Sequence, residues 1–208
     1  MTQNSTDAGF TLIELLVVMA IIATLASLAV VGIPAYMREA DRTACREHLS
    51  SIYKHLLIYN SKYKGFPTAS GPEFVFALWT SKIVDHTQSD AKIFFSAGTG
   101  NQPPEDVDSL TADDIDYTGP DQSNMRVRIR PQMRNANDFA IASNRVPAEV
   151  EGEEDLSQFP HAGTGINVLF AGGAVEWFDT EDDFGGDYPI IGPDSPIKKL
   201  QTLVPDRY

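Results

Sequence analysis

The N-terminal part of the chain contains one uninterrupted apolar run. Residues 10–33 carry a single charge, Glu14, and three other polar side chains, Thr11, Thr24 and Ser27. A helix of this length spans roughly 36 Å, which exceeds the thickness of a bilayer hydrocarbon core of about 30 Å. The pattern therefore predicts a helix of membrane-spanning length over residues 10–33.

Helical periodicity continues beyond this run. Pro34 removes one backbone hydrogen bond, so we expect a kink there. Further on, apolar residues recur at steps of three or four, with charged residues on the other face. This apolar stripe consists of Met37, Ala44, Leu49, Ile52, Tyr53, Leu56 and Leu57. One long helix over residues 10–64 is predicted, and its second half needs a sheet or similar body against the stripe.

A C-terminal stop signal follows the stripe. Lys62 and Lys64 favour the negative end of the helix dipole, and Gly65 is suited to the left-handed cap. Pro67 cannot continue the helix. The long helix is therefore expected to end near residue 64.

Short strand-like segments separated by turn formers fill residues 65–208. Strands are predicted at residues 92–96, 125–130, 139–143, 166–171 and 174–178. Residues 74–79 fit a helix or a strand, and residues 97–124 read as a long surface loop. The predicted class is α+β, with a long N-terminal helix packed on a small antiparallel sheet in a β-rich head over residues 65–208.

The last two predicted strands form a hairpin. Gly172-Gly173 between them predicts a two-residue turn. With that turn, Val175 and Trp177 can join the face formed by Ile166, Val168 and Phe170.

Composition narrows the possible functions. The 208-residue chain has a net charge of −13, which disfavours a general nucleic-acid binder. Cys45 is the only cysteine, so an intrachain disulfide and a Cys-based zinc site are excluded. Cys45 is read as a small packed residue; the alternative is that Arg42 and Arg46 nearby lower its pKa.

Glu14 distinguishes the interpretations of the apolar run. Ser27-Leu28-Ala29 is compatible with a cleaved secretory signal, but no Lys or Arg precedes residue 10. A plain membrane anchor leaves Glu14 unexplained, because a carboxylate inside a membrane helix costs ~2.5–3.5 kcal/mol on insertion scales and usually marks a function. The third interpretation is an anchor with a function.

The stretch GFTLIELLVVMAII resembles the processing site of type IV pilins and type II secretion pseudopilins. The resemblance implies that prepilin peptidase cuts between Gly9 and Phe10, removes residues 1–9 as a leader and methylates the new amino terminus at Phe10. It also implies that Glu14 meets the amine of a neighbouring subunit. Because a wrong register would leave both charges unpaired in an apolar core, Glu14 would specify the assembly register.

The resemblance further implies location and partners. The precursor would cross the bacterial cytoplasmic membrane once, with an extracytoplasmic head, and then enter a periplasmic or extracellular filament. The partners would be like subunits, prepilin peptidase, and assembly-platform and motor proteins. Arg38, Arg42 and Arg46 follow the span, and the positive-inside rule alone would place the head in the cytoplasm. We weight the motif more, because acidic residues are interleaved with these arginines.

Residues 159–179, FPHAGTGINVLFAGGAVEWFD, are similar to the C-terminal segment of planctomycete-type pilin-like proteins. Their signature is a His, about nine residues, then Asp-Gly. Here Gly172 replaces the Asp and Ala174 the following His, so the hairpin is expected but a ligand role at those positions is not. His161 is read as a surface or turn residue rather than a ligand.

An acidic cluster near the C-terminus is a candidate calcium site. Asp179, Asp182, Asp183 and Asp187 surround Gly185-Gly186, and calcium prefers carboxylate and carbonyl oxygens at a flexible turn. The major pseudopilins bind calcium in a C-terminal loop, which supports the idea by analogy. A solvated acidic loop is the competing interpretation. No other cofactor is expected.

The sequence contains no catalytic motif for a nucleophile, phosphate loop, zinc protease or dinucleotide site. We therefore predict a non-enzymatic, prepilin-like structural subunit that is cleaved, N-methylated and assembled into a type IV pilus or a type II secretion pseudopilus. The alternative is a membrane-anchored extracytoplasmic binding module for calcium or a basic ligand that does not polymerise. A membrane-anchored hydrolase is a third and weaker alternative.

Overall fold

The computed structural model describes residues 11–122, 134–146, 159–186 and 188–205, without the side chains of residues 28–35. The chain divides into two compact units, residues 1–39 and residues 40–208. The α-helices and strands are α1 (Leu12–Tyr63), α2 (Pro72–Thr80), α3 (Gln88–Ala91), β1 (Tyr117–Thr118), β2 (Ala140–Asn144), β3 (Gly165–Phe170), β4 (Val175–Asp179) and α4 (Thr180–Phe184). The expected α+β class is confirmed.

The predicted long helix is confirmed as α1, which begins at Leu12 and ends at Tyr63. Its backbone stays helical through Pro34, whose side chain lies outside the described residues, so the kink there stays a prediction. Among the described residues, no helix combines the length and the apolar character needed to cross a membrane.

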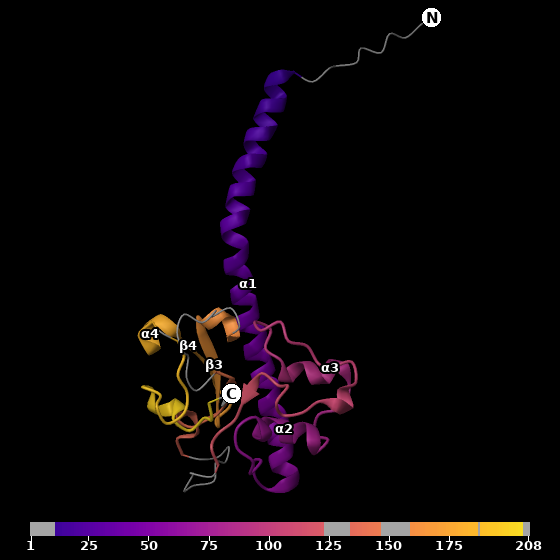
Figure 1. The fold of residues 1–208 in the computed structure, drawn as a ribbon, viewed down its shortest axis with the longest axis vertical. Coiled ribbons are helices and arrows are strands. Elements are labelled where there is room, and N and C mark those ends of the chain that lie inside the picture. Colours follow the sequence, from indigo (N-terminus) through magenta and orange to yellow (C-terminus); the bar gives the residue numbers. More distant parts are fainter. Residues whose placement is uncertain (1–10, 123–133, 147–158, 187, 206–208) are drawn as a thin grey trace, which may run out of the picture. The chain divides into compact units, whose positions relative to one another are not determined.

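The C-terminal part of α1 buries one stripe in the second unit. Leu49, Ile52 and Leu56 of the predicted stripe are fully buried there. Cys45 is buried with them, whereas its neighbour Ala44, which the prediction placed on the stripe, is only partly buried. In that unit, α2 and α3 lie on one side of α1, and β3, β4 and α4 lie on the other (Figure 1). Leu57, which the prediction placed on the stripe, is exposed, and so is Met37 in the first unit.

The end of α1 differs from the expectation at one residue. Lys64, with φ 62°, takes the left-handed conformation that we predicted for Gly65. Its N–H donates to the carbonyl of Asn60 at 2.9 Å, and its ammonium donates to the carbonyl of Ser61 at 3.1 Å. These two bonds give partners to carbonyls of the last turn that have none within the helix, and this offsets the strain of the left-handed backbone at Lys64.

The sheet has four antiparallel strands in the order β1-β2-β3-β4. All six residues of β3 are buried, because both faces of the sheet are covered. Leu169 joins the core that contains Leu49 and Leu56 of α1. The other face of β3 packs on the C-terminal segment of the chain, in a second core formed by Ala140, Val146, Ile166, Val168, Phe170, Phe178, Ile191, Leu200 and Leu203.

The predicted β3–β4 hairpin is confirmed, but its register is not. Leu169 pairs with Val175, and the N–H of Phe170 donates to the carbonyl of Ala174, so three residues form the connection. The third of them, Gly173, has φ 91°, as expected for a three-residue hairpin with a left-handed last residue. One extra turn residue moves Val175 and Trp177 to the face opposite Ile166, Val168 and Phe170.

Four further predictions have different outcomes. Residues 92–96 are not a strand, because Lys92–Phe94 forms a 3-10 helix directly after α3. Residues 97–122 are not simply a surface loop, since they include β1 and the buried side chains of Leu110 and Ile115. The ambiguous segment 74–79 is helical and belongs to α2. The strand predicted at residues 125–130 lies outside the described residues.

We expect Gly173→Ala to destabilise the second unit by about 3 kcal/mol, since the new methyl meets a left-handed backbone and a rigid ring. A Cβ at Gly173 would lie 2.5 Å from Cε1 of Tyr53 on α1. The matched control is Gly100→Ala, where φ is 74° and nothing lies within 4 Å, so only the backbone cost of about 1 kcal/mol applies. Urea unfolding measures the free energy of unfolding of both variants. Equal destabilisation by the two substitutions would contradict the role of the Tyr53 contact.

Candidate functional site

The start of α1 is a reciprocal capping box. Oε2 of Glu14 accepts hydrogen bonds from the N–H and the hydroxyl of Thr11, both at 2.8 Å. The N–H of Glu14 donates back to Oγ1 of Thr11 at 3.3 Å. Thr-x-x-Glu at a helix start satisfies backbone donors that have no partner within the helix. Glu14 therefore has a defined local role within its own chain.

The position of Glu14 in the first turn of α1 is electrostatically favourable. The free N–H groups of a helix start carry partial positive charge, and a carboxylate there is stabilised. Gly9 and Phe10, the predicted cleavage pair, lie immediately before this turn and outside the described residues. The role of Glu14 in an assembly register stays a prediction.

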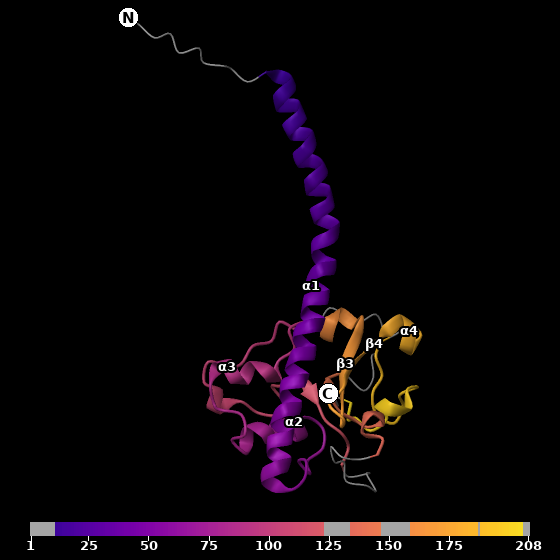
Figure 2. The ribbon, with the colours of Figure 1, turned by 180° about the vertical axis from the view of Figure 1, so that it is seen from behind.

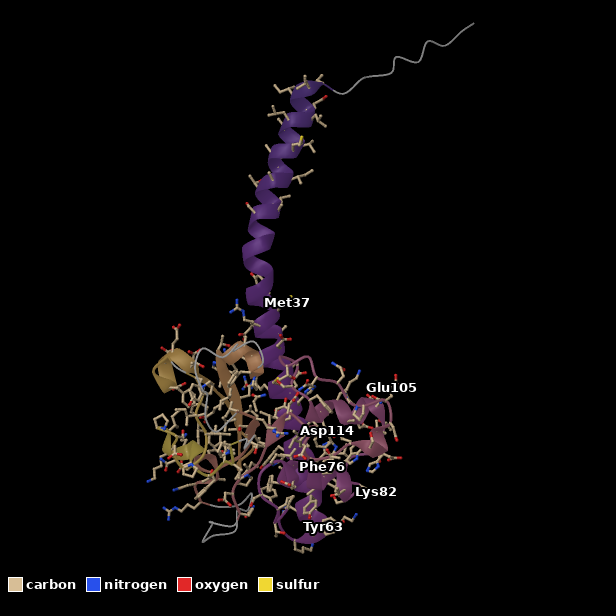
Figure 3. The ribbon with its side chains drawn as sticks, in the orientation of Figure 1. Met37, Tyr63, Phe76, Lys82, Glu105 and Asp114 are labelled. Atoms are coloured by element: carbon tan, nitrogen blue, oxygen red, sulfur yellow. The ribbon has the colours of Figure 1, made fainter. Side chains whose placement is uncertain are left out.

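Apolar side chains surround Glu14 on α1. Leu12, Ile13, Leu16 and Met19 each leave more than three fifths of their surface exposed within this chain. Figure 3 shows the side chains of this part of α1 projecting on all sides of the helix. Every described side chain from residue 11 to residue 27 is exposed, so this part of α1 presents an apolar surface around one carboxylate.

Residues 4–30 match the family model described as the prokaryotic N-terminal methylation motif. The chain carries the signature of type IV pilins and pseudopilins. The matched residues include Gly9, Phe10 and Glu14, so the resemblance read from the sequence is confirmed for this segment. The signature marks the chain as a pilin-like substrate for prepilin processing, and pilin-like structural subunits are in general not enzymes.

The pilin signature covers only the N-terminal segment. No curated protein and no solved structure matches the chain. The similarity of residues 159–179 to planctomycete-type pilin-like proteins stays a prediction, although the hairpin that it implied is present.

Three of the four acidic residues predicted as calcium ligands belong to the short helix α4 or cap it. Oδ1 of Asp179 accepts from the N–H groups of Glu181 and Asp182, and Oδ2 of Asp183 accepts from the N–H of Asp179. Two of these carboxylates therefore serve as caps. Asp187 lies outside the described residues, and among those described no three metal-binding side chains gather.

Cys45 is packed as expected, but its surroundings are polar. It is fully buried in the second unit, and its Sγ lies 3.0 Å from Oγ of Ser96. Burial raises the pKa of the Cys45 thiol, but nearby polar groups, first His161 and then Ser96 and Tyr117, outweigh it and lower the pKa to about 7. The neighbouring His161 was missed by the sequence reasoning, because the two residues lie far apart along the chain.

His161 lies in a turn, as one interpretation had it, but it is buried rather than on the surface. Its ring packs edge-on against Trp177 with the centroids 5.2 Å apart, and the guanidinium of Arg42 lies 4.4 Å from the centre of the same indole. His161 and Ala162 have φ of 55° and 52°, and Gly163 follows with 72°. A left-handed backbone costs non-glycine residues roughly 1–2 kcal/mol each. The buried ring contacts therefore hold a strained turn.

A thiol beside an imidazole is the arrangement found in catalytic cysteine sites, but here both groups are buried away from solvent. Cys45 and His161 are both inside the core, so a substrate has no access to the sulfur in this state. The amide nitrogen Nδ2 of Asn167 faces Nε2 of His161 at 3.4 Å, with the donor of the pair on the asparagine. A base-orienting partner would have to accept a proton from that nitrogen instead.

We expect Thr11→Val to loosen the first turn of α1, because it removes the hydroxyl that donates to Glu14 and accepts from its N–H. The loss of a threonine cap costs about 1 kcal/mol. Amide hydrogen exchange over residues 12–16 of the detergent-solubilised protein measures this loosening, and we expect the exchange to be faster in the variant. Thr24→Val is the control, since the hydroxyl of Thr24 only donates to the carbonyl of Ile21. Equal acceleration in both variants would contradict the capping role.

The calcium prediction is tested with Asp182→Asn, because the Asp182 carboxylate takes no part in the capping bonds of α4. If calcium binds, adding it raises the unfolding temperature of the parent protein by mass action, and Asp182→Asn reduces this rise. Glu105→Gln, in the exposed acidic segment before β1, is the control. If calcium leaves the unfolding temperature of the parent protein unchanged, the calcium prediction is wrong.

Proposed function

We propose that the chain is a structural subunit that prepilin peptidase cleaves after Gly9 and methylates at Phe10, and that then polymerises through α1 into a type IV pilus or a type II secretion pseudopilus. The observation that carries the proposal is the methylation motif at residues 4–30 at the start of a helix with an apolar surface. In this proposal the partners are like subunits, the peptidase, and assembly-platform and motor proteins.

The apolar surface of α1 has one role before assembly and another after it. In the precursor, residues 10–33 anchor the chain once in the cytoplasmic membrane and leave the head outside. In the filament, the same side chains pack against the helices of other subunits. Burial in both states keeps the transfer nearly balanced in free energy, because the apolar surface is shielded from water in each.

The separation of the two units of the chain fits this proposal. The second unit contains both hydrophobic cores and buries its stripe of α1 without using the side chains of residues 12–27. The apolar part of α1 is therefore available for lipid or for other helices. A binding module that is only anchored would use the helix and its cap, but it would not need the charge of Glu14.

The first experiment is mass spectrometry of the mature N-terminus, from cells that contain a prepilin peptidase. We expect a chain that begins with N-methylated Phe10. A start near Val30 would indicate an ordinary secretory signal and contradict the proposal. A start at Met1 or Thr2 would favour the static anchor.

The second experiment separates polymerisation from anchoring with two variants of Glu14. Glu14→Leu removes the charge and the capping acceptor, whereas Glu14→Gln removes the charge but keeps an acceptor for Thr11. We expect both variants to be inserted and processed, and neither to enter filaments that are sheared from cells and quantified by immunoblot. Normal filaments with Glu14→Gln would show that capping, not the charge, is what assembly needs. Normal filaments with both would contradict the assembly role.

A further inference from the structure

The segment that follows α2 folds back and places an imidazole ring on Trp79. Lys82, with φ 54°, reverses the chain after α2, and its N–H donates to the carbonyl of Trp79 at 2.9 Å. The ring of His86 stacks on the indole of Trp79, with the centroids 4.1 Å apart and the planes inclined by 2°. Trp79 is itself buried in the core that also contains Leu49 and Leu56. The proposed function does not use this arrangement.

Both ring nitrogens of His86 face atoms that only accept hydrogen bonds. Nδ1 lies 3.1 Å from Oδ1 of Asp108, and Nε2 lies 3.1 Å from the carbonyl oxygen of Trp79. Neither a carbonyl nor an ionised carboxylate has a proton to donate. A neutral imidazole carries one N–H and can donate to one of these oxygens, whereas imidazolium donates to both. The geometry therefore fits the doubly protonated ring.

The stacking on Trp79 favours the same charge state. The face of an indole carries partial negative charge and attracts a cation that lies over it. The side chain of His86 is 29% exposed, but that of Asp108 is 78% exposed, so the ion pair alone would contribute little. The bond to the Trp79 carbonyl and the stacking add to it, because all three contacts hold one ring in one position.

His86 faces a segment that covers part of the core. Asp108 belongs to the 3-10 helix Val107–Ser109. Val107 packs against the core that α2 helps to form, and Leu110 is buried in it. The contact between His86 and Asp108 therefore joins the turn after α2 to a segment that shields apolar side chains.

A second side chain joins the same two segments without a titratable group. The side-chain amide of Gln88, at the start of α3, donates to the carbonyls of Pro104 and Glu105. This contact is independent of pH, so it keeps the start of the segment in place when the contact of His86 weakens. Loss of the His86 contact should therefore loosen residues 107–110 locally rather than unfold the unit.

We propose that His86, in its doubly protonated form, is a clasp that holds residues 104–110 on Trp79 of α2, and that loss of one ring proton loosens this clasp. In the neutral ring, one nitrogen lone pair faces an oxygen lone pair, so one of the two hydrogen bonds is lost. This inference concerns the second unit alone and does not depend on filament formation.

The sign of the pH dependence follows from which form of the ring is held. Because the clasped state favours the protonated ring, the clasp is complete at low pH. It weakens as the pH rises through the interval in which imidazole side chains lose their charge, about pH 5–8.

Other charged side chains around the ring do not replace Asp108. They are Glu73 on α2, Lys82 and Asp85 in the turn, Asp90 and Lys92 in and after α3, and Glu105 and Asp106 on the facing segment. The carboxylate of Asp90 accepts from the hydroxyl of Thr87 at 2.6 Å, and that of Asp106 accepts from the N–H of Asp108 at 3.1 Å. In the described part of the chain, Asp108 is the acidic residue that pairs with His86.

The first experiment measures amide hydrogen exchange in the full, detergent-solubilised chain, as protection factors that are corrected for the intrinsic effect of pH. The N–H groups of Ser109 and Leu110 donate within the clasped segment and report its opening. We expect their protection to be roughly threefold lower at about pH 8 than at about pH 5, the size typical of one exposed charged contact. Unchanged protection would overturn the proposal.

Two histidine variants assign this pH dependence. His86→Phe keeps a stacked ring and removes both hydrogen bonds, so its protection should be low and equal at the two pH values. His55→Gln is the control, because His55 lies on α1 with Nδ1 against the carbonyl of Ser51, outside the clasp, and the dependence should persist. A dependence that persists in His86→Phe, or disappears in His55→Gln, would show that another group causes it.

An Asp108 variant tests why the ring needs two protons. In Asp108→Asn, the side-chain amide can donate to Nδ1 of the neutral ring while Nε2–H donates to the Trp79 carbonyl, so the pH dependence should disappear. Asp113→Asn is the charge-matched control, since Asp113 is exposed and its backbone carbonyl, which asparagine keeps, accepts from Arg145. Persistence of the dependence in Asp108→Asn, or its loss in both variants, would overturn the proposal.

Discussion

The burial of one stripe of α1 against the sheet organises the rest of the second unit. Leu49, Ile52 and Leu56 meet α2, β2 and β3 in one continuous core, and the sheet then offers its other face to the C-terminal segment. Figure 2 shows the C-terminal part of α1 passing between the α2–α3 side and the strand side of this unit. A shift of α1 by one residue would expose this stripe, because its members are spaced for a single helical face.

That packing also explains which features could be predicted from the sequence. The long helix, the stripe and the β3–β4 hairpin follow from local periodicity and from glycine, and the structure contains all three. The hairpin register could not be predicted, because Gly172 and Gly173 are compatible with a turn of two or three residues. The close contact of Tyr53 with Gly173 is a tertiary constraint with no local signature.

The remaining errors have similar causes. Strand-like residues at 92–96 form a 3-10 helix because they continue directly from α3 and place Phe94 in the core. Leu110, Ile115 and Tyr117 are buried in a segment whose polar composition is typical of a loop. The polar residues around Cys45, such as Ser96 and His161, come from separate segments, so no spacing along the chain could indicate that they meet. The pilin signature was readable because its chemistry lies in consecutive residues.

The two units provide hydrogen-bond partners for polar side chains in different ways. A polar atom inside an apolar environment needs a partner of matching direction. At the start of α1, the partners of Glu14 are local, because Thr11 supplies two donors three residues away. Within the second unit, Cys45 contacts Ser96, 51 residues away, and Asn144 donates to the same hydroxyl, so these partners meet only when the unit is folded. The hydrogen bonds of Glu14 therefore need only the first turn of α1, whereas the contact of Cys45 with Ser96 needs the folded second unit.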